Sequence, residues 1–175
     1  MTETDATNGA ATPENGGGFT VSHILGEITW LFTQSPLHRA LAIGDLEWLV
    51  MPALILRQFY IFRDGDRPVG LALWARCGPE AVAKLERGML EPEDRLSLEE
   101  WSSGDSIWLV DLIAPFADGS NRHREIMMAD LISGPLGGQR FNFHQTNPVT
   151  GERTVQVVEA DAGEKLKKAI ADAIG

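Results

Sequence analysis

A histidine follows a proline in the segment "SPLHR", residues 35–39, at the end of an apolar stretch with helical spacing. Histidine is the side chain that changes charge near neutral pH, so its position bears on acid–base chemistry. His38 fits two roles: a solvent-facing or capping residue of a loop, or a general base. The choice between them depends on whether the rest of the chain supplies a partner.

An aspartate interrupts the apolar run "SIWLVDLIAPF", residues 106–116. A carboxylate in a buried strand must be paired, hydrogen-bonded or protonated, because burying it alone is costly. Side chains of a strand alternate between its faces, so Asp111 is predicted to share a face with Leu109 and Ile113. Asp111 either accepts backbone N–H bonds that hold a loop, or it orients and charges a histidine as in acyl-transfer sites. Pro115 is expected to end the strand pairing and to open a cleft.

For the other residues that could take part in chemistry, the sequence favours structural roles. His23 and His123 are expected at the surface and His144 in a core or rim position. Cys77 has no neighbour typical of a thiol nucleophile, so we interpret it as structural. The chain has no Gly-x-Ser-x-Gly elbow and no Gly-x-x-x-x-Gly-Lys phosphate loop. The tryptophans, which usually pack in a core but could also form the wall of an acyl-binding site, are Trp30, Trp48, Trp74, Trp101 and Trp108.

The elements that must position these side chains can be predicted from hydrophobic spacing. Apolar residues recur at helical intervals over residues 21–32, and Pro36 ends this helix because the residue before a proline disfavours helical backbone. A second helix is predicted to begin near Asp45. Pro52 lies inside it and should bend the helix or mark its restart.

A change to shorter spacing after residue 58 predicts strands. The segments 59–63 and 68–76 flank "DGD" and are typical of a β-hairpin. The later elements that we expect are a helix at 79–88, an exposed acidic segment at 91–101, a strand at 106–116, a helix at 121–133, strands at 139–145 and 153–160, and a final helix at 162–174. This order predicts an α/β or α+β fold with a mixed sheet.

The bulk composition is that of a globular domain. Of the 175 residues, 43% are hydrophobic and 23% are charged. Residues 20–175 are predicted to form one domain, and the polar residues 1–19 a disordered tail. A single cysteine excludes an intramolecular disulfide and the usual zinc clusters. The net charge of −10 argues against nucleic-acid binding.

The start of the chain lacks the basic residues and apolar run of a signal peptide. No apolar run approaches the roughly 20 residues that span a bilayer. Together these patterns predict a cytoplasmic protein without a membrane span.

Three segments resemble a known family. "GEITWLFTQSPLHR" (26–39), "MPALILRQFYIFRDGDRPVGLALWA" (51–75) and "EWSSGDSIWLVDLIAPFAD" (100–118) are similar to the signature segments of the RTX toxin-activating lysine acyltransferases, the family of the hemolysin-activating protein. Ser-Pro-Leu-His-Arg, followed by Trp-x-x-Gly-Asp and Asp-x-Ile-Ala-Pro-Phe, is the specific part. The resemblance covers about residues 20–118, and the last third of the chain only loosely.

The resemblance implies a GNAT-like acyltransferase fold with a central mixed, mostly antiparallel sheet flanked by helices. It implies an enzyme that transfers a fatty acyl chain from acyl carrier protein to internal lysines of an RTX protoxin, with no cofactor of its own. The family's catalytic histidine and aspartate fall on His38 and Asp111, and its serine near the histidine falls on Ser35. Members are commonly homodimeric and act in the cytoplasm of the producing cell.

The residues are consistent with that chemistry. A lysine attacks a thioester only as the neutral amine, so His38 suits a general base whose tautomer Asp111 would hold; alternatively His38 carries the acyl group itself. The absence of a glycine-rich pyrophosphate loop favours a protein-borne acyl donor over coenzyme A. Residues 35–79 hold five arginines against four acidic residues. The arginines that could dock an acidic carrier protein are Arg39, Arg57, Arg63, Arg67 and Arg76.

The chain also departs from the family pattern. It has "GLALWA" (70–75) where the family usually has "AYCSWA", and Leu112 replaces an aromatic residue after Asp111. These departures leave the acyl-chain length, the protoxin and the dimer contacts open. Two other functions stay open as well: a GNAT-like acyltransferase that acts on another protein or amine, and a non-catalytic homologue that binds carrier protein or toxin.

Overall fold

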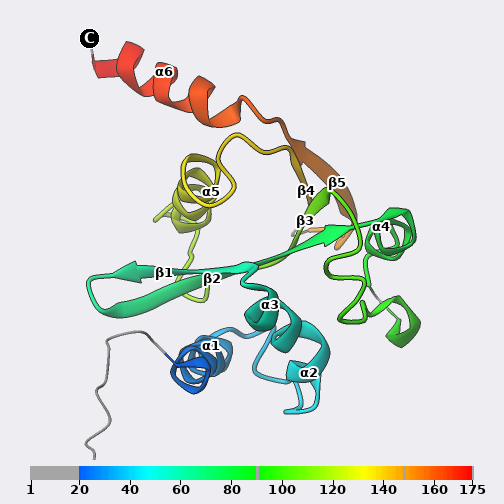
Figure 1. Cartoon of the computed structure of the whole chain (residues 1–175). Helices are drawn as coiled ribbons and strands as arrows, with labels where there is room; N and C mark the ends of the chain where they lie inside the picture. The colour runs from blue at the N-terminus through cyan, green and yellow to red at the C-terminus, as the bar shows by residue number, and fades with distance from the viewer. Residues whose placement is uncertain (1–19, 90, 148, 175) are drawn as a thin grey trace, which may run out of the picture.

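The computed structural model describes residues 20–89, 91–147 and 149–174, so the predicted disordered tail lies outside the described residues. Its centre is one sheet of five strands in the order β1-β2-β3-β4-β5 (Figure 1). The strands are β1 (Phe59–Asp64), β2 (Arg67–Cys77), β3 (Ser106–Ile113), β4 (Phe141–Thr146) and β5 (Arg153–Val158). Among the strands of the described residues, only β3 and β4 are parallel neighbours. The predicted mixed, mostly antiparallel sheet is confirmed, whereas its GNAT-like character stays a prediction from the resemblance.

Helices cover both faces of this sheet (Figure 1). One face packs against α1 (Val21–Gln34), α2 (Asp45–Leu49) and α3 (Met51–Leu56), and the other against α5 (His123–Ser133). The remaining helical segments are α4 (Pro79–Glu86), the short 3₁₀ turn η1 (Pro92–Asp94) and α6 (Ala162–Ile174). The order of elements agrees with the predicted order, and the acidic segment 91–101 contains only the short turn.

The helix α1 forms and ends as its sequence predicts. At its start the Thr20 hydroxyl accepts a hydrogen bond from the backbone N–H of His23, which is a typical N-cap. Its buried face, which includes Ile28 and Leu31, packs on the sheet. The helix stops at Gln34, directly before the cap residue Ser35 and Pro36, because the residue before a proline disfavours helical backbone.

The predicted break at Pro52 divides the second helical stretch into two helices. α2 ends at Leu49 and α3 begins at Met51, with Val50 between them. Pro52 lies in the first turn of α3, where its missing N–H leaves no hydrogen bond unmade. The two short helices then cover the end of the sheet next to α1.

A register shift interrupts the pairing of β3 with β2. Asp111 lies opposite Leu73, but Leu109 lies opposite the next residue of β2, Trp74. Val110 therefore has no partner in β2. Such an extra residue in one strand is a β-bulge, and it changes the direction of the side chains that follow it.

The bulge places Asp111 on the α1 side of the sheet. Leu109 belongs to the buried cluster below α5, whereas Val110 and Ile113 pack in the cluster below α1. Asp111 faces the α1 side too, since it contacts His38. The prediction that Asp111 shares a face with Ile113 is confirmed, and the prediction that it shares one with Leu109 is wrong because the alternation slips by one residue at the bulge.

Strand β3 leaves its parallel neighbour before Asp111. Ile107–Leu109 pair with Phe141–Phe143 of β4, and residues 110–113 have no partner there. The end of β3 that holds Asp111 is thus paired only with β2. The Asp111 carboxylate thus lies on the part of β3 that is no longer paired with β4.

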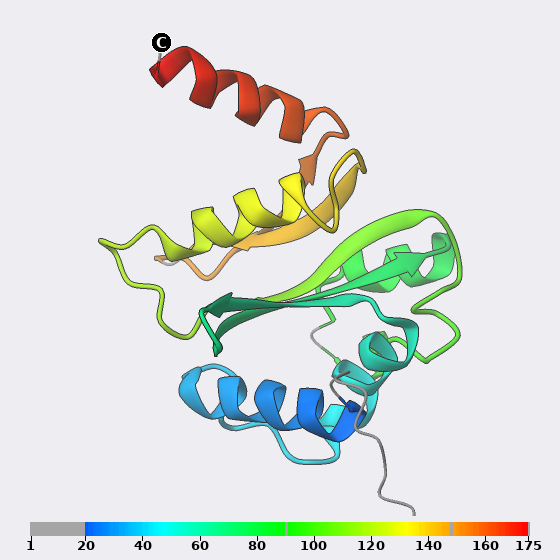
Figure 2. The ribbon, with the colours of Figure 1, turned by 60° about the vertical axis from the view of Figure 1, so that its left-hand side comes forward.

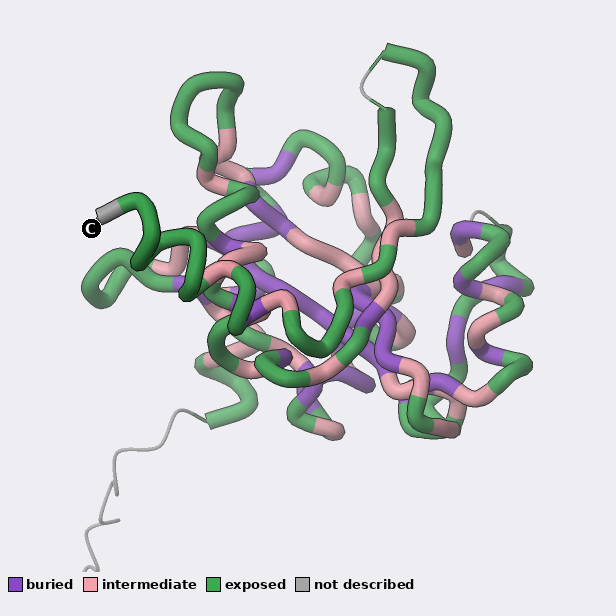
Figure 3. Tube along the Cα trace, turned by 90° about the horizontal axis from the view of Figure 1, so that it is seen from above, coloured by how far each residue is buried: buried purple, intermediate pink, exposed green. Residues whose placement is uncertain are grey.

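The helix α6 extends away from the sheet beyond α5 (Figure 2). Most of its described side chains are exposed, as its green tube in Figure 3 shows. In the described part of the chain no helix, α6 included, is long and apolar enough to cross a membrane.

At Gly104, the backbone of the loop that leads into β3 packs directly against the backbone of Cys77 and Gly78. A Cβ on Gly104 would lie 2.6 Å from the carbonyl oxygen of Cys77 and 2.7 Å from the Cα of Gly78. We expect Gly104→Ala to lower the free energy of unfolding by about 1–3 kcal/mol, because neither backbone can move aside freely. Urea denaturation measures this change. Gly119→Ala is the control, since a Cβ there would meet nothing within 4 Å; equal losses in both variants would contradict the expectation.

Candidate active site

Ser35, His38 and Asp111 form one hydrogen-bonded chain. The Ser35 Oγ lies 2.7 Å from Nδ1 of His38, and Nε2 of the same ring lies 2.8 Å from Oδ2 of Asp111. His38 and Asp111 are 73 positions apart in the sequence. The fold therefore brings the three residues of the predicted site into direct contact.

The end of α1 sets the positions of Ser35 and His38. The backbone N–H groups of His38 and Arg39 both donate to the Ser35 carbonyl, at 3.1 and 3.0 Å. This turn places side chains three positions apart next to each other, as in a helix. The buried ring of Phe32 packs 5.1 Å from the imidazole, centroid to centroid, and limits its orientation.

The contacts determine where the imidazole holds its proton. An ionised carboxylate only accepts hydrogen bonds, so Nε2 of His38 must donate to Asp111. When the ring is neutral, Nδ1 is then the acceptor, and the Ser35 hydroxyl donates to it. Both ring nitrogens are engaged, and the neutral tautomer is fixed by its two neighbours.

The three groups differ in their access to solvent. Ser35 is buried, with 6% of the residue exposed. The exposed fractions of the side chains are 13% for His38 and 26% for Asp111. Of the three groups, the carboxylate is the most accessible to solvent and the serine the least.

This arrangement can transfer a proton between a hydroxyl and an imidazole while a carboxylate stabilises the imidazolium. The order serine, histidine, aspartate is that of acyl-transfer triads. The two nitrogens are exchanged relative to the serine-protease pattern, because here Nδ1 faces the hydroxyl and Nε2 faces the carboxylate. The geometry suits acyl transfer to or through one of these groups.

The five arginines of the predicted docking surface lie in different places. Arg63 and Arg67 flank the β1–β2 turn, and Arg63 binds Glu27 through two hydrogen bonds. Arg57 and Arg76 lie beyond the other end of the β1–β2 pairing, and Arg76 donates to Gln139. Arg39, which follows His38, is exposed, and so is Arg57. Carrier docking by these residues stays a prediction.

Two of the remaining histidines, His144 and His23, have other partners. His144 Nε2 donates to the Leu85 carbonyl at 2.6 Å, and burial lowers the pKa of this imidazole. His23 Nε2 lies 3.5 Å from a carboxylate oxygen of Glu27. Among the described residues, no group of three or more His, Cys, Asp or Glu side chains could hold a metal ion.

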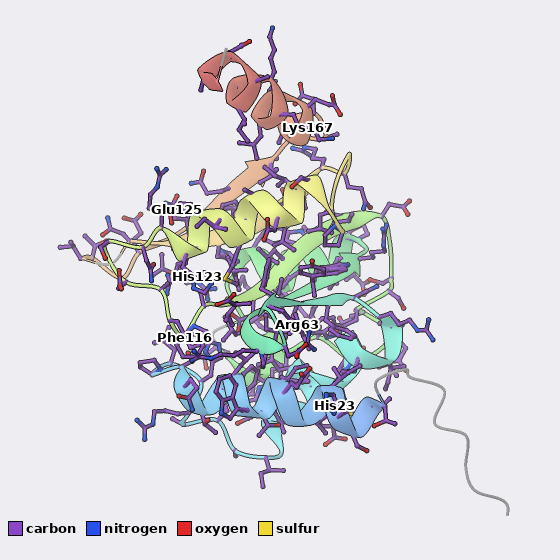
Figure 4. The ribbon with its side chains drawn as sticks, turned by 90° about the vertical axis from the view of Figure 1, so that its left-hand side faces the viewer. His23, Arg63, Phe116, His123, Glu125 and Lys167 are labelled. Atoms are coloured by element: carbon purple, nitrogen blue, oxygen red, sulfur yellow. The ribbon has the colours of Figure 1, made fainter. Side chains whose placement is uncertain are left out.

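Two cavities that we did not predict flank the β1–β2 hairpin, which Figure 4 shows end-on between α1 and α5. The first has a volume of about 450 Å³ and lies between α1 and the start of β2. We call it the α1 groove, and it is lined by residues of α1 and of the start of β2: Ser22, His23, Gly26, Glu27, Trp30, Arg67 and Pro68. The second, of about 480 Å³, lies between the hairpin and α5 and is lined by Phe62, Phe116 and His123, among others.

One sequence signal could have indicated the α1 groove. Ser22, Gly26 and Trp30 recur at intervals of four and so lie on one face of the helix. The sequence does not indicate which residues lie opposite this helix face, because the other wall comes from the β1–β2 hairpin. Of the five tryptophans, Trp30 lines the groove, whereas Trp74, Trp101 and Trp108 are buried in the core and Trp48 is partly buried against it.

Comparison with known proteins places both site motifs within one family. The model of the RTX toxin acyltransferase family matches residues 18–160, a range that includes Ser35, His38 and Asp111. The chain belongs to the RTX toxin acyltransferase family. The resemblance of the three quoted segments to that family is thereby confirmed.

Individual relatives in this family are moderately similar. The chain is 38% identical over 132 residues to the protein-lysine myristoyltransferase RtxC of Kingella kingae, a match that covers 70% of this chain and 77% of the relative. It is 37% identical over 95 residues to the protein-lysine myristoyltransferase HlyC of Escherichia coli, covering 54% of each. It is 34% identical over 98 residues to the RTX-II toxin-activating lysine-acyltransferase ApxIIC of Actinobacillus pleuropneumoniae, covering 56% and 59%. The chain thus spans less than two thirds of the length of several relatives that it matches.

The prediction that Cys77 is a structural residue and not a nucleophile can be tested directly. The thiol is 2% exposed, and burial raises its pKa to about 12. Since the thiolate is the reactive form, we expect no labelling of the native protein by iodoacetamide at pH 8, and complete labelling in urea. Mass spectrometry measures both, and the single cysteine of the chain makes the reading unambiguous. Rapid labelling with the native circular dichroism spectrum intact would show that the thiol is accessible.

Proposed function

We propose that this protein is a protein-lysine acyltransferase that moves a fatty acyl chain from acyl carrier protein to internal lysines of an RTX protoxin and so activates it. The observation that supports this most is the hydrogen-bonded chain Ser35–His38–Asp111, because it joins the two family motifs across 73 positions. Membership of the RTX toxin acyltransferase family supports the reaction class. Relatives named lysine-acyltransferase and lysine myristoyltransferase support a lysine acceptor and an acyl donor.

The reaction needs a proton acceptor at one point. The lysine ammonium must lose a proton before its nitrogen attacks the thioester carbonyl. The new C–N bond forms, the C–S bond breaks, and the carrier leaves with its thiol while the lysine becomes an amide. The first proton of the ammonium goes to solvent before the attack. In this proposal His38 takes the second proton from the nitrogen as the C–N bond forms and gives it to the leaving sulfur, and Asp111 stabilises the imidazolium in between.

Ser35 lies between the imidazole and any group that approaches Nδ1. In the first route its hydroxyl relays the proton from the amine to Nδ1, or rotates away so that the amine reaches Nδ1 directly. In the second route Nδ1 itself attacks the thioester and holds the acyl group until the lysine takes it. Both routes use the same three residues, and both require the Ser35 hydroxyl to change partners.

The donor and the partners follow from the resemblance and from the residues. A protein-borne thioester is favoured because the chain has no glycine-rich pyrophosphate loop, and the proposed reaction needs no cofactor. The exposed Arg39 and Arg57 are the arginines best available to an acidic carrier protein. On the pattern of the family, the proposal also includes that the protein acts in the cytoplasm and as a homodimer.

We expect His38→Ala to lower the rate of lysine acylation by roughly 10²–10⁴-fold, the usual effect of removing a general base. Asp111→Asn should lower it as well, since the amide no longer balances the charge of an imidazolium. The assay combines acyl-loaded carrier protein with a protoxin fragment that contains the acceptor lysines, and mass spectrometry counts the modified lysines.

His123→Ala is the matched control, because it removes a histidine outside the hydrogen-bonded chain, and it should leave the rate near that of the unaltered protein. Acylation by His38→Ala at the unaltered rate would overturn the site assignment. An unaltered protein that binds carrier protein or protoxin but modifies no lysine would instead indicate the non-catalytic homologue.

A further inference from the structure

A buried glutamine lies between α3 and β1, outside the hydrogen-bonded chain of the candidate site. Gln58 is 7% exposed and directly precedes Phe59, the first residue of β1. A buried amide needs hydrogen-bond partners, because desolvating it alone is costly. Its NH₂ group lies 3.0 Å from the carbonyl oxygen of Trp74 and 3.1 Å from that of Trp101, and it donates to both. These two acceptors fix the orientation of the amide, since its oxygen cannot donate.

The first of these bonds replaces a backbone bond of the sheet. The pairing of β1 with β2 ends with Phe59 opposite Leu73, which leaves Gln58 opposite Trp74. Opposite residues that share a hydrogen bond in an antiparallel pair normally exchange two. The Trp74 N–H donates to the Gln58 carbonyl at 3.0 Å, but the Gln58 N–H donates to the carbonyl of Ala53 in α3. The side chain of Gln58 therefore gives the Trp74 carbonyl the bond that its backbone cannot give.

The second bond ties in a third segment of the chain. Beyond Phe59, β1 no longer pairs with β2, and the segment around Trp101 lies beside β2 instead. The Trp101 carbonyl accepts a hydrogen bond of 2.9 Å from the backbone N–H of Arg76 as well as the bond from Gln58. The Gln58 amide thus spans the junction between two successive neighbours of β2 and holds the strand there at Trp74.

Trp74 is the residue of β2 at which the pairing with β3 shifts. It lies opposite Leu109, whereas the residue before it, Leu73, lies opposite Asp111. The backbone of Trp74 is thus bound to Gln58 on the β1 side and borders the bulge at Val110 on the β3 side. A change of register by one residue turns the side chains that follow it to the other face of a sheet. The position of this bulge therefore decides which face receives the Asp111 carboxylate.

We propose that Gln58 is a positioning residue of the candidate active site: its amide anchors Trp74 at the register shift, and the anchored bulge directs the Asp111 carboxylate toward His38. Gln58 acts through the backbone of Trp74 and Leu73 and not by touching the reacting groups. The inference rests on the proposed function for its effect on the reaction rate. Its geometric part can be tested without lysine acylation.

The first test observes the contact between His38 and Asp111 by NMR. The Nε2 proton of His38 donates to a carboxylate oxygen 2.8 Å away, so it should give a downfield ¹H resonance that exchanges slowly with water. The variant His38→Ala assigns this resonance by removing it. In Gln58→Leu the Trp74 carbonyl loses its side-chain donor, and we expect the resonance to be lost while the circular dichroism spectrum remains that of a folded protein. Absence of the resonance from the unaltered protein, or its persistence in Gln58→Leu, would overturn the proposal.

Gln139→Leu is the matched control. It also removes a glutamine amide from the protein interior, one that is half-buried and bonds the Arg76 side chain and the Pro135 carbonyl. This amide does not bond the backbone at the register shift, so the His38 resonance should persist. Loss of the resonance in both variants would mean that general destabilisation removes it, and the assignment of Gln58 would fail.

The rate of lysine acylation measures the consequence for catalysis. We expect kcat of Gln58→Leu to fall by roughly 10–100-fold, because a misplaced catalytic group slows the chemical step. KM for the protoxin fragment should stay near that of the unaltered protein, since no substrate contact is removed. A merely structural role would lower the melting temperature and leave kcat of the folded variant unchanged, and that result would overturn the proposal.

A measurement on the unaltered protein covers the case in which Gln58→Leu does not fold. The side-chain amide protons of Gln58 should exchange with solvent at least roughly tenfold more slowly than those of the exposed Gln145, because both are buried and bonded to carbonyls. Equal exchange rates would refute the anchoring bonds.

The outcomes also separate this inference from the proposed function. Loss of the His38 resonance in Gln58→Leu, together with an unaltered protein that acylates no lysine, would support the positioning role and refute the proposed reaction. Lysine acylation by Gln58→Leu at the unaltered rate, with the resonance kept, would refute the positioning role and leave the proposed reaction in place.

Discussion

The contact between the His38 imidazole and the Asp111 carboxylate connects the first helix to the middle of the sheet. A carboxylate on an otherwise apolar strand needs a hydrogen-bond donor, because it is costly to bury without one. His38 supplies that donor only if α1 packs on the face of the sheet toward which Asp111 points and ends beside β3. The buried residues Ile28 and Leu31 hold the helix there through their contacts with the core. Packing and polar pairing thus require the same placement of α1.

Two irregularities of the backbone complete the arrangement. The helix ends at Gln34, before Pro36, and the turn after it directs the side chains of Ser35 and His38 toward each other. Strand β3 contains the unpaired Val110, which turns Asp111 toward α1. A regular strand in phase with Leu109 would direct the carboxylate to the α5 side. The candidate site therefore depends on interruptions of regular structure, as is common for sites of chemistry.

Some of this could be predicted from the sequence, for physical reasons that differ by element. Proline acts locally, so the end of α1 and the break at Pro52 were predicted and are confirmed. The hairpin around "DGD" is equally local. The bulge at Val110 was missed because valine at that position is typical of an ordinary strand, and only the pairing partner reveals the extra residue. The α1 groove was missed because its second wall comes from β2, and the arginines counted together in the sequence are separated by the length of the hairpin.

The order of the strands has a consequence for how the molecule assembles. Every strand lies beside its neighbour in the chain, so the sheet can form through comparatively short loop closures, which favour fast folding. Contact between His38 and Asp111 joins positions 73 apart and needs α1 docked beside β3, whose end at Asp111 is paired with β2. A kinetic species with complete strands and an undocked first helix would have the native sheet signal in spectroscopy, but its imidazole would lack the carboxylate. Recovery of the His38–Asp111 contact during refolding would thus report the docking of α1 on the sheet, which recovery of the strands alone does not.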